Sequence, residues 1–179
     1  QKIEVYEIIV ADNKDDISSI PESFTEIDQK IRYCSSKDST IIAYAKVGNG
    51  PPILKAPNFM SSLEHDWRSP IWTHMYRFLA EKNTLVRFDQ RGNGSSDLDP
   101  LDITFESFVD DVDAVVNDTK INKFPILGVS QGCAVSIAYA IKNPNKVSHL
   151  ILFGGFARGK GQRNDPVSYT HLRAHETRI

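Results

Sequence analysis

The stretch GVSQG at residues 128–132 decides how the rest of the chain is interpreted. It overlaps the end of FPILGV (residues 124–129), an apolar run typical of a buried strand, and small helix-forming residues follow from Gln131 onward. Ser130 is therefore predicted to lie on a sharp turn between a strand and a helix. The glycines on either side would relieve crowding in that turn, and the helix would direct free N–H groups toward Ser130.

Five residues are a short pattern, so a glycine-rich structural turn is the alternative interpretation. The context of strand, turn and helix favours a nucleophilic serine. Such a serine needs a histidine to accept its proton and a carboxylate to orient that histidine. The histidine and the carboxylate therefore have to be sought elsewhere in the sequence.

The remaining segments predict an α/β sheet. A hairpin is expected from strands at 30–36 and 40–47, with its turn at Lys37 and Asp38. After a short strand at 52–56, the residues 57–70 are expected to form a loop. Strands then alternate with helices, which implies parallel strands with right-handed crossovers. The expected strands lie at 84–89, 124–129 and 147–155, and the expected helices at 71–81, 104–118 and 131–143.

A second turn-rich stretch, FDQRGNGSSD, occupies residues 88–97. Its G-x-G lacks the third glycine of a dinucleotide loop, and it does not follow the first strand of the series. We therefore expect Asp89 and Arg91 to hold a tight turn in which glycines adopt positive φ.

Together, D-x-R-G-x-G-x-S at residues 89–96 and GVSQG resemble the α/β-hydrolase fold family. More closely, residues 31–163 resemble hydrolase domains fused to class III adenylate cyclases or to bacterial transcription regulators. The matching stretches are IAYAKVGNGPPILKAPNFMSSLEHDWRSPIW, LVRFDQRGNGSSD, GVSQG and VSHLILFGGFARG. The resemblance implies the N-terminal half of that fold, with a mostly parallel sheet, antiparallel N-terminal strands and helices on both faces.

The resemblance also implies roles for three residues. Ser130 would be the nucleophile, and the backbone N–H of Gln131 would donate to the oxyanion. The second donor would be the N–H of Phe59, in the loop after the 52–56 strand. Family members often carry His-Gly there, whereas this chain has Pro57 and Asn58. The implied substrate is a small-molecule acyl or ester compound, and no cofactor or metal is implied.

No histidine of the chain is a clear partner for Ser130. In this fold the acid and then the histidine follow the serine along the chain. His65 and His74 precede it and are expected in surface or capping roles, while His149 is expected to point away from the carboxyl edge of the sheet. The other candidates after Ser130 lie in the C-terminal segment: Asp165, His171 and His175. We therefore expect the acid and the histidine to lie beyond this chain, and the fragment to be inactive.

Other polar clusters have structural interpretations. Glu64, His65 and Asp66 are consecutive and would not converge on one metal ion. The carboxylates of Asp110, Asp111 and Asp113 are expected on the solvent side of the 104–118 helix.

Composition narrows the class of protein. The net charge of −2 gives no case for nucleic-acid binding, and no apolar run is long enough to span a membrane. The two cysteines form no disulfide framework, which favours a reduced, cytoplasmic protein.

Three regions are predicted. Residues 1–28 are expected to be the end of an upstream domain plus an acidic linker, because KIEVYEII resembles the last strand of a cyclase domain. Residues 29–166 are expected to be the N-terminal part of an α/β-hydrolase domain, whose last strand would be an unpaired edge. Residues 167–179 contain VSYTHLRAHET, which matches the translation of a transposase-end sequencing adapter. This tail is expected not to be native, although a genuine basic tail is the alternative.

Two functions from different classes are compatible with these observations. The intact parent could be a serine hydrolase of a multidomain signalling protein, with a covalently linked upstream domain. Alternatively, the fold could serve as a non-catalytic ligand-sensing module that regulates a cyclase or DNA-binding partner, since a fold alone does not establish an activity.

Overall fold

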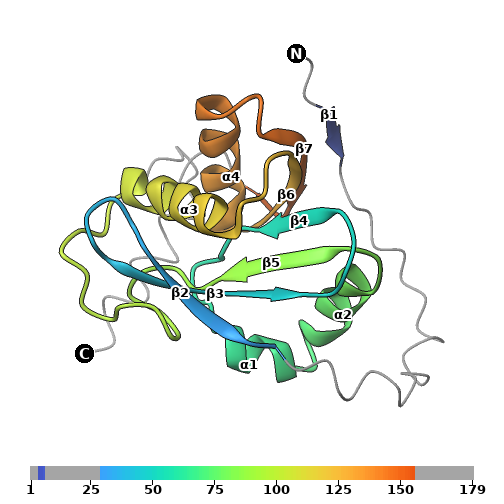
Figure 1. Cartoon of the computed structure of the whole chain (residues 1–179), viewed down its shortest axis with the longest axis horizontal. Helices are drawn as coiled ribbons and strands as arrows, with labels where there is room; N and C mark the ends of the chain where they lie inside the picture. The colour runs from blue at the N-terminus through green and yellow to red at the C-terminus, as the bar shows by residue number, and fades with distance from the viewer. Residues whose placement is uncertain (1–3, 7–28, 156–179) are drawn as a thin grey trace, which may run out of the picture.

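A computed structural model describes residues 4–6 and 29–155 of the chain. Its centre is a seven-stranded sheet with the order β1-β7-β6-β4-β5-β3-β2, covered by helices on both faces (Figure 1). The strands are β1 (Glu4–Tyr6), β2 (Ile31–Ser35), β3 (Ile41–Val47), β4 (Pro52–Lys55), β5 (Thr84–Phe88), β6 (Phe124–Val129) and β7 (Val147–Phe153). The helices are α1 (Leu63–Arg68), α2 (Thr73–Lys82), α3 (Phe105–Thr119) and α4 (Gln131–Lys142).

The sheet is antiparallel on one side and parallel on the other, as expected. Strands β2 and β3 form the expected hairpin, and β3 also runs antiparallel to β5. Strands β5, β4, β6 and β7 then pair in parallel. The expected α/β class, with a mostly parallel sheet and helices on both faces, is confirmed.

Each face of the sheet has its own apolar core because a parallel sheet is buried on both sides. Valines of α3 and the apolar side of α4 pack on one face, whereas α1 and α2 cover the other (Figure 1). The first core is built around Leu54, Val86, Val112, Val115, Phe124, Ile126 and Tyr139. The second is built around Ile53, Trp67, Tyr76, Ala80 and Leu85. No helix within the described ranges is long and apolar enough to cross a bilayer.

The main error in the predicted elements lies between residues 57 and 70, where a loop was expected. The structure has a short helix there, α1, which begins after Ser62. The hydroxyl of Ser62 accepts a hydrogen bond from the N–H of His65 at 3.2 Å, a normal N-cap contact. The helix is held by its tertiary contacts, since Leu63 and Trp67 are buried. In contrast, the expected N-cap of α3 at Thr104 is confirmed.

Strand β7 is not the unpaired edge that the sequence predicted. Residues of β1 pair in parallel with its outer side, with Glu4 opposite His149 and Tyr6 opposite Ile151. The KIEVYEII stretch is thus described as a strand over residues 4–6, and residues 1–3, 7–28 and 156–179 lie outside the described ranges. The assignment of residues 1–28 to an upstream domain stays a prediction, as does that of the 167–179 tail.

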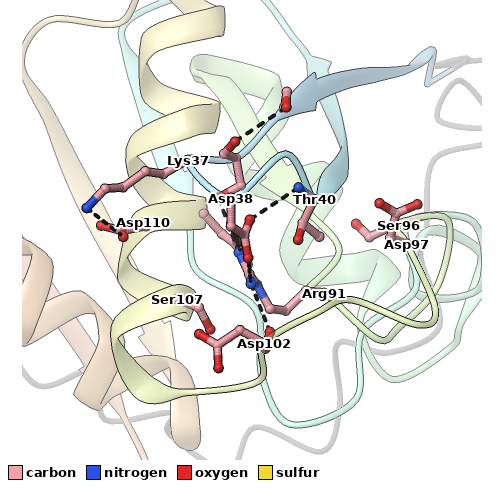
Figure 2. Close-up of polar contacts among 12 residues, drawn as sticks. Lys37, Asp38, Thr40, Arg91, Ser96, Asp97, Asp102, Ser107 and Asp110 are labelled. Carbon is pink, nitrogen blue, oxygen red and sulfur yellow. Dashed lines mark hydrogen bonds and ion pairs between the residues drawn. The ribbon is translucent and has the colours of Figure 1, made fainter.

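The turn after β5 is held by a buried arginine. The Arg91 guanidinium is 1% exposed and forms a two-pronged ion pair with Asp111 of α3, at 2.6 and 2.9 Å. It also donates to Asp38 at 2.6 Å and to the carbonyl oxygen of Asp102 at 2.8 Å (Figure 2). Arg91 therefore ties the β2–β3 turn and the loop before α3 to α3 itself.

The expected role of Asp89 and Arg91 in a tight turn is thus confirmed. Asp89 accepts a hydrogen bond from the N–H of Ser95 at 2.9 Å, and Gly92 and Gly94 have φ of 77° and 54°. The expectation for Asp111 is wrong: its side chain is 1% exposed and paired with Arg91.

We expect Asp111→Ala to lower the free energy of unfolding by about 3–5 kcal/mol, because it leaves a buried guanidinium without its main partner. The matched control is Asp110→Ala, one residue earlier on α3. Asp110 pairs with Lys142, which is half exposed. The loss of unfolding free energy in Asp110→Ala should stay below about 1 kcal/mol, because an exposed ion pair contributes little. Urea unfolding of the three proteins measures both values, and equal losses would contradict the role given to Arg91.

A second prediction concerns the stability of the fold at low pH. The hydrogen bond from Arg91 holds the pKa of Asp38 well below its usual range. A carboxyl group whose pKa is lower in the folded state stabilises the fold above about pH 4 and loses that contribution as the pH falls further. The free energy of unfolding should therefore fall more steeply between about pH 5 and pH 2 in the wild type than in Asp38→Asn. Parallel pH profiles would refute this.

Candidate active site

Ser130 occupies the turn between β6 and α4 in a backbone conformation that few non-glycine residues adopt. Its φ is 53° and its ψ is −117°. The N–H of Ser130 donates to the carbonyl oxygen of Phe153 in β7 at 3.0 Å, and its own carbonyl accepts from Cys133 at 3.1 Å. The side chain makes no capping hydrogen bond to α4, although Ser130 holds the N-cap position. The turn thus presents a serine hydroxyl that the helix does not use.

The two glycines of the motif allow two close backbone contacts. A Cβ on Gly128 would lie 2.7 Å from the carbonyl oxygen of Gly132, inside the turn itself. A Cβ on Gly132 would lie 2.6 Å from the carbonyl oxygen of Pro57, in the loop that follows β4. Distances under 3.0 Å are shorter than packed atoms tolerate. Gly132 therefore brings the serine turn and the 57–60 loop against each other.

An open pocket of about 460 Å³ lies over Ser130. Its walls come from the β6–α4 turn, the loop after β4 and the starts of α1 and α2. The lining residues are Asn58, Phe59, Met60, Ser61, Ser62, His65, Asp66, Trp72, Val129 and Ser130. Phe59 and Met60 are 69% and 72% exposed, so the rim of the pocket is apolar.

The structure brings together the three residues that the sequence singled out. Ser130 and Phe59 line the same pocket, and Gln131 is the first residue of α4. The side chain of Gln131 donates to the side-chain oxygen of Gln90 at 3.1 Å, and the backbone N–H group of Gln90 donates to the Ser61 hydroxyl. These bonds tie the start of α4 to the turn after β5.

The described histidines differ in their relation to Ser130. His65 was expected in a surface or capping role, but the structure places it in the lining of the pocket. His74 is exposed on α2. His149 lies near the start of β7, whereas Ser130 bonds to Phe153 at the end of that strand. One imidazole nitrogen of His149 is 3.1 Å from the Ser148 hydroxyl.

Two buried basic residues in neighbouring strands were not predicted from the sequence, and one of them, Lys55, contacts Asn58 and Trp72 of the pocket lining. Lys55 ends β4 and Arg87 lies opposite it in β5, and each is 3% exposed. Burial lowers the pKa of Lys55 to about 7, assisted by Arg87 and opposed by the Asp66 and Asp89 carboxylates. Burial also raises the pKa of Asp89 to about 6. The sequence did contain a signal for this buried pair: a lysine and an arginine at matching positions of two neighbouring apolar strands.

With this geometry in place, comparison with known proteins defines the family. Residues 63–173 match the family model described as alpha/beta hydrolase fold. The chain belongs to the α/β-hydrolase fold family.

Relatives with established names include a pyrrolizixenacetamide deacetylase from Xenorhabdus hominickii. It is 25% identical over 122 residues, which cover 68% of this chain and 44% of that protein. The crystal structure of the esterase RhEst1 from Rhodococcus sp. ECU1013 is 27% identical, with a TM-score of 0.62 over 74% of this chain and 48% of the esterase. A haloalkane dehalogenase variant from Bradyrhizobium elkanii shares the fold at 19% identity and a TM-score of 0.64, over 83% of this chain and 48% of its own. This chain spans about half the length of the relatives it matches.

The contact of Gly132 with Pro57 generates a prediction. We expect Gly132→Ala to cost about 1–3 kcal/mol of unfolding free energy, because the added methyl group forces the helix and the loop apart. The control is Ala134→Ser, which adds one atom at a half-buried position of the same helix. It should cost about 0.5 kcal/mol. A Gly132→Ala protein as stable as this control would mean that the two backbones do not restrain each other.

Proposed function

We propose that the intact protein is a serine hydrolase that cleaves ester, amide or similar acyl bonds through an acyl-enzyme at Ser130. The observation that supports this most is the conformation of Ser130, which lies over an open pocket with positive φ and does not cap its helix. Strain of this kind costs about 1–3 kcal/mol and occurs mainly at functional sites. The deacetylase and esterase relatives, named for the cleavage of acyl groups, agree with this chemistry.

In this proposal the Ser130 oxygen attacks the acyl carbon while its proton passes to a histidine. The leaving alcohol or amine departs with a proton from that histidine, and water then cleaves the acyl-enzyme. The N–H of Gln131, at the positive end of the α4 dipole, would donate to the oxyanion. The N–H of Phe59 would be the second donor, since Phe59 lines the same pocket.

The histidine and its carboxylate are proposed to lie in a part of the protein that this chain does not contain. Two observations support this: this chain spans about half the length of its relatives, and His149 is placed toward the other end of β7. We therefore propose that the 179-residue chain is inactive by itself.

The wider context is proposed from sequence alone. The resemblance of the KIEVYEII stretch to a cyclase strand supports a multidomain signalling protein in which another domain precedes residue 29, although residues 4–6 pair with β7 in this structure. The two free cysteines support a cytoplasmic location. The adapter-like tail supports a non-native origin of residues 167–179. Sequencing the gene in both directions from codons 30–160 tests both points.

A fluorophosphonate probe tests the activity. We expect it to label the full-length protein at about pH 7 and to leave Ser130→Ala unlabelled, because the probe reacts with activated serine hydroxyls. Ser35→Ala is the control, since Ser35 is exposed on β2 and does not line the pocket. It should keep its labelling.

Two outcomes would overturn parts of the proposal. A full-length wild type that stays unlabelled would contradict a hydrolase and favour a ligand-sensing module. Labelling of Ser130 in the 179-residue chain would contradict its proposed inactivity.

A further inference from the structure

Lys55 is a buried cation that the fold does not need. It sits in β4, between β5 and β6 at the centre of the sheet, where an apolar side chain would pack without cost of desolvation. None of the ion pairs found among the described residues includes Lys55. Its neighbour on the next strand is Arg87, another cation. The Asp66 and Asp89 carboxylates favour the charged amine, but burial and the charge of Arg87 oppose it more strongly, so the presence of a lysine here calls for a different explanation.

Aromatic rings and one amide surround the ammonium group. Its nitrogen lies 5.9 Å from the ring centres of both Trp72 and Tyr76, within cation–π range. Arg87 lies on the same Tyr76 ring, at 4.1 Å. The hydrogen bond of Lys55 goes to the side-chain oxygen of Asn58, in the loop that begins immediately after the strand.

Asn58 connects Lys55 to the rim of the pocket through two hydrogen bonds of its side chain. Its amide oxygen accepts from Lys55, and its amide nitrogen donates to the carbonyl oxygen of Met60 at 3.2 Å. The hydrogen bond from the Asn58 side chain to Met60 thus spans Phe59, the one residue between them. The Phe59 side chain is largely exposed and supplies little restraint of its own.

The base of the same loop is held by backbone contacts. The N–H of Ala56 donates to the carbonyl oxygen of Leu127 at 2.9 Å and continues the pairing of β4 with β6. The carbonyl oxygen of Pro57 then packs against Gly132. These backbone contacts fix residues 56 and 57, and the hydrogen bonds of the Asn58 side chain fix residues 58–60.

We propose that Lys55, acting through Asn58, is a positioning residue that orients the 57–60 loop so that the Phe59 N–H group points to the acyl oxygen of a substrate at Ser130. This inference rests on the proposed hydrolase function. Donors to an oxyanion are effective only when they are preorganised, and displacement by about 1 Å can cost about a hundredfold in rate. A lysine suits this task because its long stem crosses the apolar core and its end carries three donors.

The test compares Lys55→Met with the wild type in the full-length protein. We expect fluorophosphonate labelling of Ser130 and the kcat for p-nitrophenyl acetate to fall by about tenfold to a hundredfold, with KM changed less than about threefold. Unfolding free energy at about pH 7 should stay the same or rise, because methionine keeps the volume and removes the cost of burying an amine in the core. Lys46→Met, at an exposed position of β3, should change none of these quantities.

Asn58→Leu is the second variant. Asn58 is half buried in the loop after β4, so this substitution leaves the packed core unchanged. It should slow labelling as much as Lys55→Met does. The double variant should be no slower than either single variant, because both substitutions break the same chain of contacts. Peptide-level hydrogen exchange should become faster over residues 58–60 in both variants and stay unchanged in β6.

The outcomes separate this inference from the function on which it rests. If the full-length wild type is not labelled, the proposed hydrolase is wrong, and the positioning role in catalysis falls with it. If the wild type is labelled and both variants react at its rate, the positioning role alone is overturned. A slow Asn58→Leu protein with unchanged exchange over residues 58–60 would also overturn it, because the loop would not have moved.

Discussion

The candidate site depends on one close contact between two backbones, that of Gly132 with the carbonyl oxygen of Pro57. The serine turn lies on one side of this contact and the 57–60 loop on the other. Both segments leave neighbouring strands, since β4 and β6 pair directly through Leu54 and Ile126. The separation of the serine turn from Pro57 is therefore set by the sheet and by the absence of a Cβ, rather than by adaptable side chains. A pocket built in this way is rigid at its base and adaptable only at its apolar rim.

Much of the fold could be predicted because its determinants are local in sequence. The β2–β3 turn at Lys37 and Asp38 and the cap of α3 at Thr104 each depend on residues a few positions apart. The position of Ser130 was predictable for the same reason, since strand, turn and helix follow one another without interruption. The parallel direction of the later strands followed from their alternation with helices.

The features that the sequence did not predict depend on distant partners. Asp111 lies beside the valines of α3 and would face solvent on a helical pattern alone, but Arg91 reaches it from the turn after β5. In the sequence, Lys55 is a single polar residue in an apolar strand. Its position beside Arg87 depends on the pairing of β4 with β5, which the sequence does not reveal. Helix α1 is too short for a periodic pattern and is held by the burial of Trp67. In each case tertiary contacts overrode the local signal.

The pairing of β1 with β7 joins segments near the two ends of the described chain. The strand pairs that do not involve β7 can form before it has been synthesised, because β7 follows their strands in sequence. Of the described strands, β1 is synthesised first and its partner β7 is synthesised last. Contacts between such distant segments close slowly, since the loop entropy must be overcome before they contribute any energy. The Glu4–Tyr6 segment therefore has no partner strand until β7 has been synthesised, and its docking forms the outermost of the described strand pairs on that side of the sheet.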